Sequence, residues 1–384
     1  MAEDSHVHMK LGLVRIQRGP TKRGELPKKS LGRRGFYNHM RKLNLAMIGC
    51  GMQGELVHLP ALAQSDYFDT CVLVDKSSAR AHKLAQKYNV PTVLDDFRDV
   101  VGRVDAALVV LPNYLHGPVT VELLRRGIHV LVEKPMALNT KQCDEMLEAA
   151  RSKDTTLAIG LDFRFPHTSQ LAQRILHDGV LGPLIDFDLR MGNNLSSVPV
   201  KSDYLLRNET AGGGVLMDLA VHALDLILWW LGDYEHVEYY DDSMGGVEAN
   251  CELHLRLRSG AVGIVESSRV RRLRNTCIIK GERATLEVGL WNLMGQLRLD
   301  FRDQKTCLNA ESNLPGDTWP EVFCRQLDDF ADSIMKPRAP FVPGTEGRRS
   351  IELIENCYRS RKRLRQPWLV PNDQPLIQHD VGST

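Results

Sequence analysis

The 384-residue sequence contains no C-x-x-C pair, although it has eight cysteines. These cysteines are scattered and fall mostly inside predicted strands and helices, which favours reduced thiols in a cytoplasmic protein over a disulfide framework. The chain also lacks an uninterrupted apolar run long enough to span a bilayer, and it lacks the apolar region of a signal peptide. We therefore expect a soluble, cytoplasmic protein without a membrane partner.

A large net charge is absent as well, because 49 Lys and Arg stand against 48 Asp and Glu. The molecule therefore has no overall field that would recruit nucleic acid, and we expect no nucleic-acid partner. The local exception is the segment 10–42, in which Glu25 is the single acid among eleven basic residues. Such a segment buries too little apolar surface to offset its ordering entropy.

This basic segment leaves three interpretations open. It could be an arm that contacts nucleic acid or an acidic partner, a targeting peptide, or an extension outside the folded unit. The acids Glu3 and Asp4 argue against a transit peptide. We favour the third interpretation and predict that residues 1–39 are a disordered, dispensable extension.

The length of the chain predicts two domains. Between residues 43 and 159, short apolar runs alternate with amphipathic helical stretches, which is typical of a parallel sheet. Beyond residue 160, runs such as 251–257 alternate buried and polar side chains, which predicts an antiparallel sheet with one open face. Helices are expected at 168–178, 215–231, 321–335 and 348–363. The predicted fold is an α/β Rossmann domain (40–158), then an α+β domain with an open-faced, mainly antiparallel sheet (159–371), then a tail (372–384).

Three glycines, Gly49, Gly51 and Gly54, lie between the first predicted strand and the helix that follows it. At this spacing they allow a tight turn, close approach of a pyrophosphate and close packing of helix on strand. The N-terminus of the helix attracts the phosphate charge. The turn, including Met52 and Gln53, is therefore predicted to bind a dinucleotide.

Asp75 follows the second predicted strand, where an acid binds the hydroxyls of the adenosine ribose. A carboxylate there would repel a 2′-phosphate, which favours NAD over NADP. Lys76 and Arg80 lie close enough in sequence to soften this repulsion. The predicted cofactor is NAD, with NADP less favoured.

Polar residues also end two further buried strands, with Pro112 and Asn113 after one and Glu133, Lys134 and Pro135 after the other. The carboxyl ends of parallel strands form the ligand crevice of an open α/β sheet. A lysine there can stabilise an alkoxide or transfer a proton, with a pKa that we expect partial burial to lower. A surface ion pair between Glu133 and Lys134 is the alternative.

The apolar helix predicted at 215–231 carries a polar stripe made of Asp218, His222 and Asp225. A spacing of four residues places Asp218 and His222 on one face. Carboxylates beside a histidine on a buried helix are costly unless they have a use, so Lys134, Asp218 and His222 could form a proton-transfer set. No second histidine has the spacing for a metal site, and we expect none.

Four arginines, Arg269, Arg271, Arg272 and Arg274, form a dense basic run. In an extended strand the first two point to one face and the last two to the other. One such pair could bind a phosphate on the substrate. We favour the interpretation that these arginines are solvated or lie at a subunit interface.

Together these residues make the chain resemble the Gfo/Idh/MocA oxidoreductases, from about residue 43 to 371. The resemblance is carried by the glycine fingerprint, Pro112-Asn113 with His116, Glu133-Lys134-Pro135, Arg164-Phe165 and the run from Gly212 through Asp218 and His222 to Asp225. It implies that Lys134 and His222 are the catalytic pair and that Asp218 contacts substrate hydroxyls. It also implies cofactor contacts from Pro112, Asn113, His116 and Glu133, and less strongly from Arg164.

The function that the resemblance implies is NAD-dependent interconversion of a secondary alcohol and a ketone on a sugar, cyclitol or sugar derivative. Relatives commonly pair through the open-faced sheet, so a homo-oligomer, a dimer or tetramer, is expected. Two alternatives stay open. One is an NAD-dependent glycosidase that oxidises its substrate transiently, and the other is a dinucleotide-sensing regulator without catalysis.

Deletion of residues 1–39 is expected to leave folding and cofactor binding intact, because the segment lacks the periodic apolar positions that dock on a core. Thermal unfolding and calorimetric titration with NAD⁺ check this. A large drop in the thermal midpoint of the truncated protein would show that the extension packs against the body.

Overall fold

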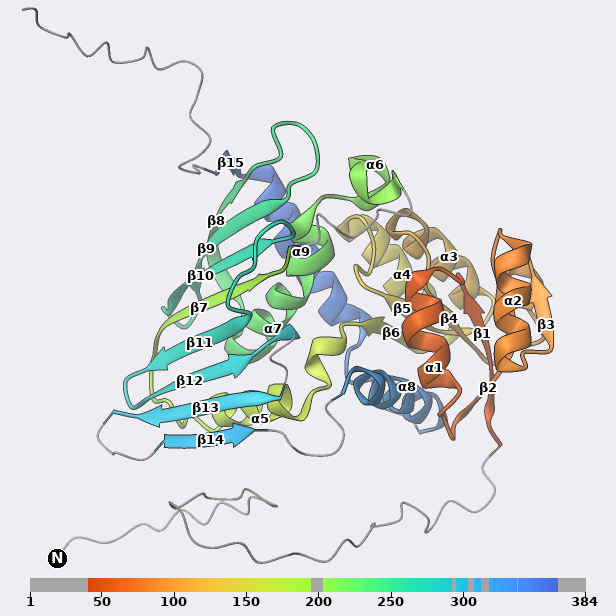
Figure 1. The fold of residues 1–384 in the computed structure, drawn as a ribbon, viewed down its shortest axis with the longest axis horizontal. Helices are drawn as coiled ribbons and strands as arrows, with labels where there is room; N and C mark the ends of the chain where they lie inside the picture. The colour runs from red at the N-terminus through yellow and green to blue at the C-terminus, as the bar shows by residue number, and fades with distance from the viewer. Residues whose placement is uncertain are drawn as a thin grey trace, which may run out of the picture.

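The computed structural model describes residues 41–194, 203–291, 295–302, 307–311, 318–336 and 338–364. The predicted extension 1–39 and tail 372–384 lie outside these residues. Two sheets dominate the structure, with helices between and around them (Figure 1). An α/β sheet is thus followed by a second, mainly antiparallel one, as the sequence predicts.

The first sheet has six strands in the order β3-β2-β1-β4-β5-β6, and every pair in it is parallel. Its strands are β1 (Leu43–Ile48), β2 (Phe68–Val74), β3 (Thr92–Leu94), β4 (Ala106–Val109), β5 (His129–Glu133) and β6 (Leu157–Gly160). The helices between them are η1 (Gly54–His58), α1 (Leu59–Leu62), α2 (Ser78–Tyr88), η2 (Phe97–Val100), α3 (Asn113–Arg125) and α4 (Thr140–Lys153). Strand β4 is buried throughout, which explains its continuous apolar sequence.

The second sheet has nine strands in the order β14-β13-β12-β11-β7-β10-β9-β8-β15. Only the pairs β7–β10 and β8–β15 are parallel among its described strands. The strands are β7 (Leu184–Gly192), β8 (Tyr234–Asp241), β9 (Asn250–Leu257), β10 (Val262–Ser268), β11 (Thr276–Gly281), β12 (Ala284–Gly289), β13 (Gln296–Phe301), β14 (Cys307–Glu311) and β15 (Arg361–Arg363). In β9, Leu253 and Leu255 are buried while His254 and Arg256 are exposed, so one face is open to solvent.

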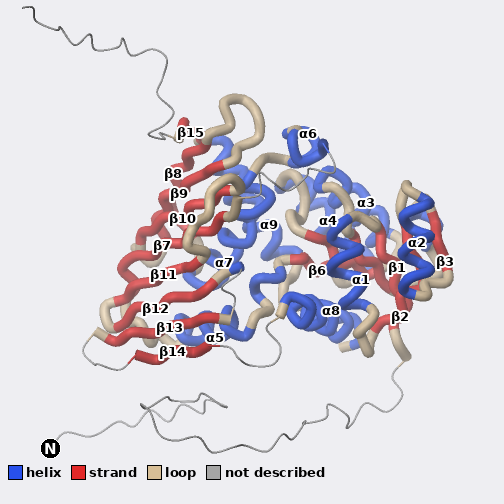
Figure 2. Tube along the Cα trace, viewed as in Figure 1, coloured by secondary structure: helices blue, strands red, loops and turns tan. Residues whose placement is uncertain are grey.

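The remaining helices are η3 (Asp162–Arg164), α5 (His167–His177), η4 (Asp203–Leu206), α6 (Asn208–Ala211), η5 (Leu216–Ala220), α7 (Val221–Leu231), α8 (Trp319–Met335) and α9 (Gly344–Arg359). Figure 2 shows α7 and α9 between the two sheets, and α9 contacts α4 and β6 on one side and α7 and β8 on the other. Helix α8 returns to the first sheet, where Phe330 stacks on Phe68 at 6.0 Å. The domain boundary near residue 158 stays a prediction.

One expectation about a single element is wrong. The helix expected at 348–363 ends at Arg359, because Arg361 pairs with the buried Asp241 (2.7 Å) and residues 361–363 extend alongside β8. The segment 208–231 is long and apolar enough by composition to cross a membrane, although Asp218 and Asp225 interrupt its apolar run. Its most apolar window is 89% buried inside the protein, which is the place of a core helix.

Candidate active site

The glycine turn after β1 has the shape that a dinucleotide requires. Gly49 has φ 103°, and a Cβ atom there would lie 2.1 Å from the carbonyl oxygen of Val110. A Cβ on Gly54 would lie 2.8 Å from the carbonyl oxygen of Gly49. No atom lies within 4 Å of the Cβ position of Gly51. The first and third glycines are therefore fixed by packing, while the second leaves room for a phosphate.

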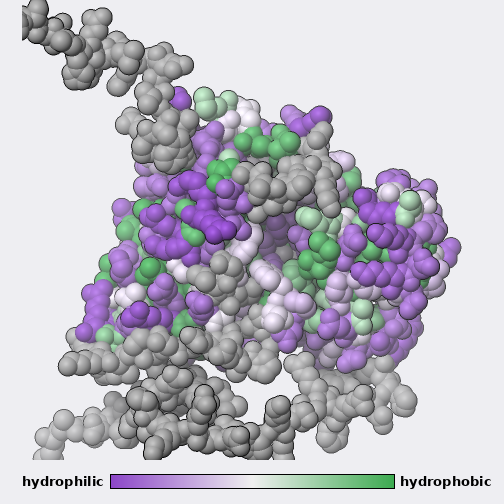
Figure 3. Space-filling view, in the orientation of Figure 1, coloured by the Kyte–Doolittle hydropathy of each residue, from purple (hydrophilic) through white to green (hydrophobic). Residues whose placement is uncertain are grey.

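A hollow of ≈ 300 Å³ adjoins this turn. It is lined by Gly51, Met52, Glu55, Leu56 and Arg80. Met52 and Leu56 are exposed hydrophobic residues, 52% and 65% accessible, so they offer apolar surface at its rim. In the space-filling view, a recess also lies between the two halves of the molecule (Figure 3).

Asp75 lies at the end of β2, as predicted, but its carboxylate is already engaged. It accepts hydrogen bonds from the backbone amides of Cys50 (2.8 Å) and Ser77 (2.7 Å) and from the guanidinium of Arg80 (2.7 Å). Burial raises the pKa of Asp75, but these hydrogen bonds outweigh it and hold the pKa below its usual value. Asp75 therefore stays ionised, with Arg80 beside it, and Lys76 is exposed.

Lys134 and Asp218 meet between the two sheets. The Lys134 Nζ donates to Asp218 Oδ1 (3.0 Å) and to the Asp218 backbone oxygen (2.7 Å). The other carboxylate oxygen accepts from the guanidinium of Arg269 (3.0 Å). Burial lowers the pKa of Lys134, but Asp218 and Glu133 outweigh burial and raise it. The expectation of a lowered pKa for Lys134 is therefore wrong, and its ammonium group stays protonated at neutral pH.

His222 is buried at the beginning of α7, one turn after Asp218. The intervening segment 216–220 is π-helical, a local irregularity that often marks functional positions. The ring of Phe163 stacks on the imidazole at 4.4 Å, with an interplanar angle of 21°. Nδ1 lies 3.2 Å from Asp162 Oδ1. Burial, together with the charge of Lys134, lowers the pKa of His222 to about 3, so its imidazole is neutral.

Asn113 and His116 make backbone contacts from α3. Asn113 Nδ2 donates to the carbonyl oxygen of Ala211 (2.8 Å), which ties the first sheet's loops to α6. His116 places its two ring nitrogens 2.7 Å from the carbonyl oxygens of Leu111 and Pro135. The ring thus bridges the chain segments that follow β4 and β5. A cofactor contact from Pro112, Asn113 or His116 stays a prediction.

Glu133 is held by a partner that the sequence did not reveal. Its Oε1 lies 2.7 Å from Nε2 of the buried His58, and its Oε2 accepts from the backbone amide of Lys134 (3.1 Å). Burial raises the pKa of Glu133, but His58 and Lys134 outweigh it and lower the pKa. The carboxylate therefore fixes the backbone that carries Lys134.

Arg164, for which a cofactor contact was expected, is bound to two carboxylates. Its guanidinium forms a two-point ion pair with Asp225 and donates to Glu346 Oε2 (2.8 Å). Both Arg164 and Asp225 are almost fully buried. Asp225 continues the predicted polar stripe in sequence, but its carboxylate is used to hold Arg164 rather than His222.

Glu248 is a further buried residue that sequence analysis missed. One carboxylate oxygen accepts from the backbone amides of Gly214 and Leu216 and from the hydroxyl of Tyr358, all at 2.9 Å. A carboxylate at the beginning of a helix satisfies amides that have no intrahelical partner. Glu248 thus fixes the start of the helix that carries Asp218 and His222.

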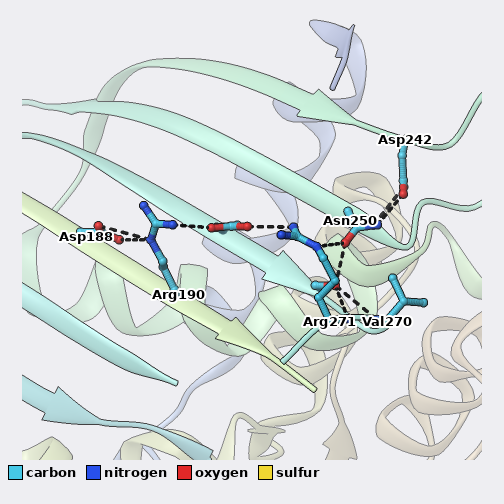
Figure 4. Close-up of polar contacts among 8 residues, drawn as sticks. Asp188, Arg190, Asp242, Asn250, Val270 and Arg271 are labelled. Carbon is cyan, nitrogen blue, oxygen red and sulfur yellow. Dashed lines mark hydrogen bonds and ion pairs between the residues drawn. The ribbon is translucent and has the colours of Figure 1, made fainter. Parts of the chain in front are cut away.

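The basic run 269–274 does not form an extended strand, because β10 ends at Ser268 and the chain bends away. Arg269 turns inward to Asp218, whereas Arg271 donates to Glu266 (2.8 Å) and Asn250 (3.0 Å). Figure 4 shows Arg271 in a chain of polar contacts that runs across the sheet to Arg190 and Asp188. Arg269 and Arg271 therefore do not form a pair. Within the described residues, no cluster of three or more His, Cys, Asp or Glu could hold a metal ion.

Comparison with known proteins agrees with this geometry. Residues 43–161 match the model of the GFO/IDH/MocA oxidoreductase family, NAD-binding Rossmann fold, and residues 169–287 match the model of that family's C-terminal domain. The chain belongs to the Gfo/Idh/MocA oxidoreductase family. The predicted resemblance, fold class and NAD-binding character are thereby confirmed.

Individual relatives act on sugars and cyclitols by name. D-glucoside 3-dehydrogenase of Escherichia coli is 31% identical over 193 residues, 50% of this chain and 54% of that protein. Myo-inositol 2-dehydrogenase of Thermotoga maritima is 22% identical over 84% of this chain and 97% of its own length. A solved aldose-aldose oxidoreductase of Caulobacter crescentus, complexed with glycerol, has a TM-score of 0.76 at 26% identity, covering 83% of this chain and 97% of that one. Several alignments with curated relatives span about half of the relative's length.

We expect NAD⁺ to bind more tightly than NADP⁺, because the ionised Asp75 repels a 2′-phosphate. Arg80→Ala should widen this preference about two- to fivefold, since a half-exposed ion pair is worth about 0.5–1 kcal/mol. Asp75→Ala should reduce the preference for NAD⁺ over NADP⁺. Calorimetric titration with both cofactors measures the preference, and Arg98→Ala, which removes a surface arginine paired with Asp96 and Glu122, is the control. Equal effects of Arg80→Ala and Arg98→Ala would contradict the role given to Arg80.

Arg269→Ala should lower kcat/KM about ten- to hundredfold, because Asp218 would lose one of its two cations and shift relative to Lys134. Arg271→Ala is the matched control, since Arg271 lies two residues away and pairs with Glu266 instead. Steady-state kinetics of both variants on one substrate provide the measurement. Losses of equal size would show that Arg269 has no special connection to the site.

Proposed function

We propose that the protein is an NAD-dependent dehydrogenase or reductase that interconverts a secondary alcohol and a ketone on a sugar, cyclitol or sugar derivative. The observation that carries this proposal is the contact of Lys134 with Asp218, one turn before His222. It brings a cation from the end of a Rossmann strand to a carboxylate and a neutral imidazole on the second domain's core helix. Dehydrogenation of an alcohol requires a group that takes the hydroxyl proton and a group that stabilises the oxygen.

The glycine turn, with Gly51, Met52 and Gln53, would hold the pyrophosphate, and Asp75 with Arg80 would lie near the adenosine ribose. When bound, the nicotinamide supplies the hydride acceptor or donor. The open space at Gly51 and the adjoining hollow support this placement.

The chain's own residues divide the remaining work. Lys134, kept charged by Asp218 and Glu133, donates a hydrogen bond to the substrate oxygen and stabilises negative charge on it. His222 takes the hydroxyl proton during oxidation and returns it during reduction. Asp218 orients Lys134 and contacts a neighbouring substrate hydroxyl.

The scattered cysteines support a cytoplasmic location, and the family resemblance supports a homo-oligomer. We propose a cytoplasmic location and a homo-oligomer that forms through the open face of the second sheet, where β9 exposes His254 and Arg256. The partner in the site is a small, sugar-like molecule.

Lys134→Ala and His222→Ala should each lower kcat by about 10²- to 10⁴-fold, the contribution of a general acid–base group, while NAD⁺ affinity changes little. A panel of unphosphorylated sugars and cyclitols, followed by charged sugars, is assayed for NADH release, and calorimetry follows NAD⁺ binding. Near-full turnover by either variant would contradict its role. Turnover without net NADH release would favour the glycosidase, and binding of NAD⁺ without any turnover would favour the regulator.

A further inference from the structure

We propose that Asp162 is a positioning residue for His222, whose carboxylate holds the Nδ1 proton and leaves Nε2 free to exchange a proton with the substrate. This inference rests on the proposed function. Asp162 begins the short helix η3 directly after β6, and His222 lies near the start of α7. Asp162 Oδ1 is 3.2 Å from His222 Nδ1, and both side chains are less than a tenth exposed.

The surroundings of the imidazole favour this partner. Nδ1 is buried and has no other polar partner among the described residues, so the Asp162 carboxylate, 3.2 Å away, is the acceptor within reach of a proton there. Phe163, the next residue after Asp162, stacks on the imidazole and fixes the plane of the ring. The segment that supplies the carboxylate therefore also orients the histidine.

The other carboxylates around His222 already have partners. Asp218 is bonded to Lys134 and Arg269, and Glu133 is bonded to His58. Among the described contacts of Asp162, in contrast, there is no ion pair with a lysine or arginine. The Asp162 carboxylate is therefore the one available to accept a hydrogen bond from His222 Nδ1.

The protonation state of the Asp162–His222 pair determines whether Nε2 of His222 donates or accepts a proton. Burial, together with the charge of Glu133, raises the pKa of Asp162 to about 8, with Lys134 opposing and Asp225 reinforcing the rise. His222 faces Lys134, Glu133 and Asp218, and its own pKa is lowered. Because the two groups are in contact, they titrate as a pair.

Below the midpoint the pair holds two protons, one between Asp162 and Nδ1 and one on Nε2, which can be given to a ketone oxygen. Above it, one proton is left on Nδ1, and the lone pair of Nε2 can accept the proton of a hydroxyl group. Oxidation of the alcohol should therefore become faster, and reduction of the ketone slower, as the pH rises through about 8.

The test compares Asp162→Asn and Asp162→Ala with wild type in kcat, KM, NAD⁺ affinity and the pH profile of oxidation. The asparagine amide donates to Nδ1 and fixes the remaining proton on Nε2, which is the wrong tautomer. We expect Asp162→Asn to lower kcat about 10²- to 10⁴-fold, to leave KM and NAD⁺ affinity nearly unchanged and to remove the pH dependence near 8. Asp162→Ala should lose less of its kcat than Asp162→Asn, because water can replace the carboxylate.

A merely structural role predicts the opposite order, since asparagine has the shape of aspartate and alanine leaves a cavity. A larger loss of activity in Asp162→Ala than in Asp162→Asn would overturn the inference while the proposed function stands. So would an unchanged pH profile in Asp162→Asn, provided that His222→Gln is inactive. Full activity of His222→Gln would instead overturn the proposed function.

If the Asp162 variants do not fold, long-range ¹H–¹⁵N spectra of histidine-labelled wild type test the inference. The His222 signal is assigned by its disappearance in His222→Gln. A proton on Nδ1 above the midpoint supports the inference, and a proton on Nε2 overturns it.

Discussion

The arrangement of the site depends on one charge, the carboxylate of Asp218, which two cations share. Lys134 approaches it from the end of a strand in the first sheet, and Arg269 approaches it from the chain that leaves the second sheet. Each cation needs an anion to offset the cost of partial burial, and one carboxylate serves both. The ion pairs therefore fix how the cofactor-binding half and the helix bearing His222 face each other.

The helix that supplies Asp218 is held at its beginning by a second buried carboxylate. Glu248 accepts hydrogen bonds from the backbone amides of Gly214 and Leu216 at the start of the helical segment and from the hydroxyl of Tyr358. A Cβ atom on Gly213 would lie 1.8 Å from the Tyr358 hydroxyl, so no larger residue fits between them. Gly213 is thus required for close packing around the Glu248–Tyr358 contact, whereas Gly51 in the turn after β1 leaves room for a phosphate.

Sequence reasoning located residues whose position follows from the local backbone. Glycine spacing located the turn after β1, a strand end located Lys134, and a four-residue spacing placed Asp218 and His222 one turn apart on the same helical segment. It failed where the partner comes from another element. Arg269 is 51 residues from Asp218, and only the order of the strands brings it there. The raised pKa of Lys134 has the same origin, because burial alone predicts the opposite direction and the deciding carboxylates are placed by the tertiary fold.

The polar stripe of the buried helix shows why such patterns identify residues better than roles. A charged group on an apolar helix must find a partner, and the sequence shows this need without showing which partner meets it. Asp218 forms ion pairs with Lys134 and Arg269. Asp225, one turn past His222, forms a buried, two-point ion pair with Arg164. Sequence analysis placed Asp225 on the polar stripe, and the family resemblance implied a cofactor contact for Arg164; in the structure these two side chains pair with each other. His222 lies between these two carboxylates, and the group that faces its Nδ1 comes from neither end of the stripe but from Asp162 at the end of the Rossmann sheet.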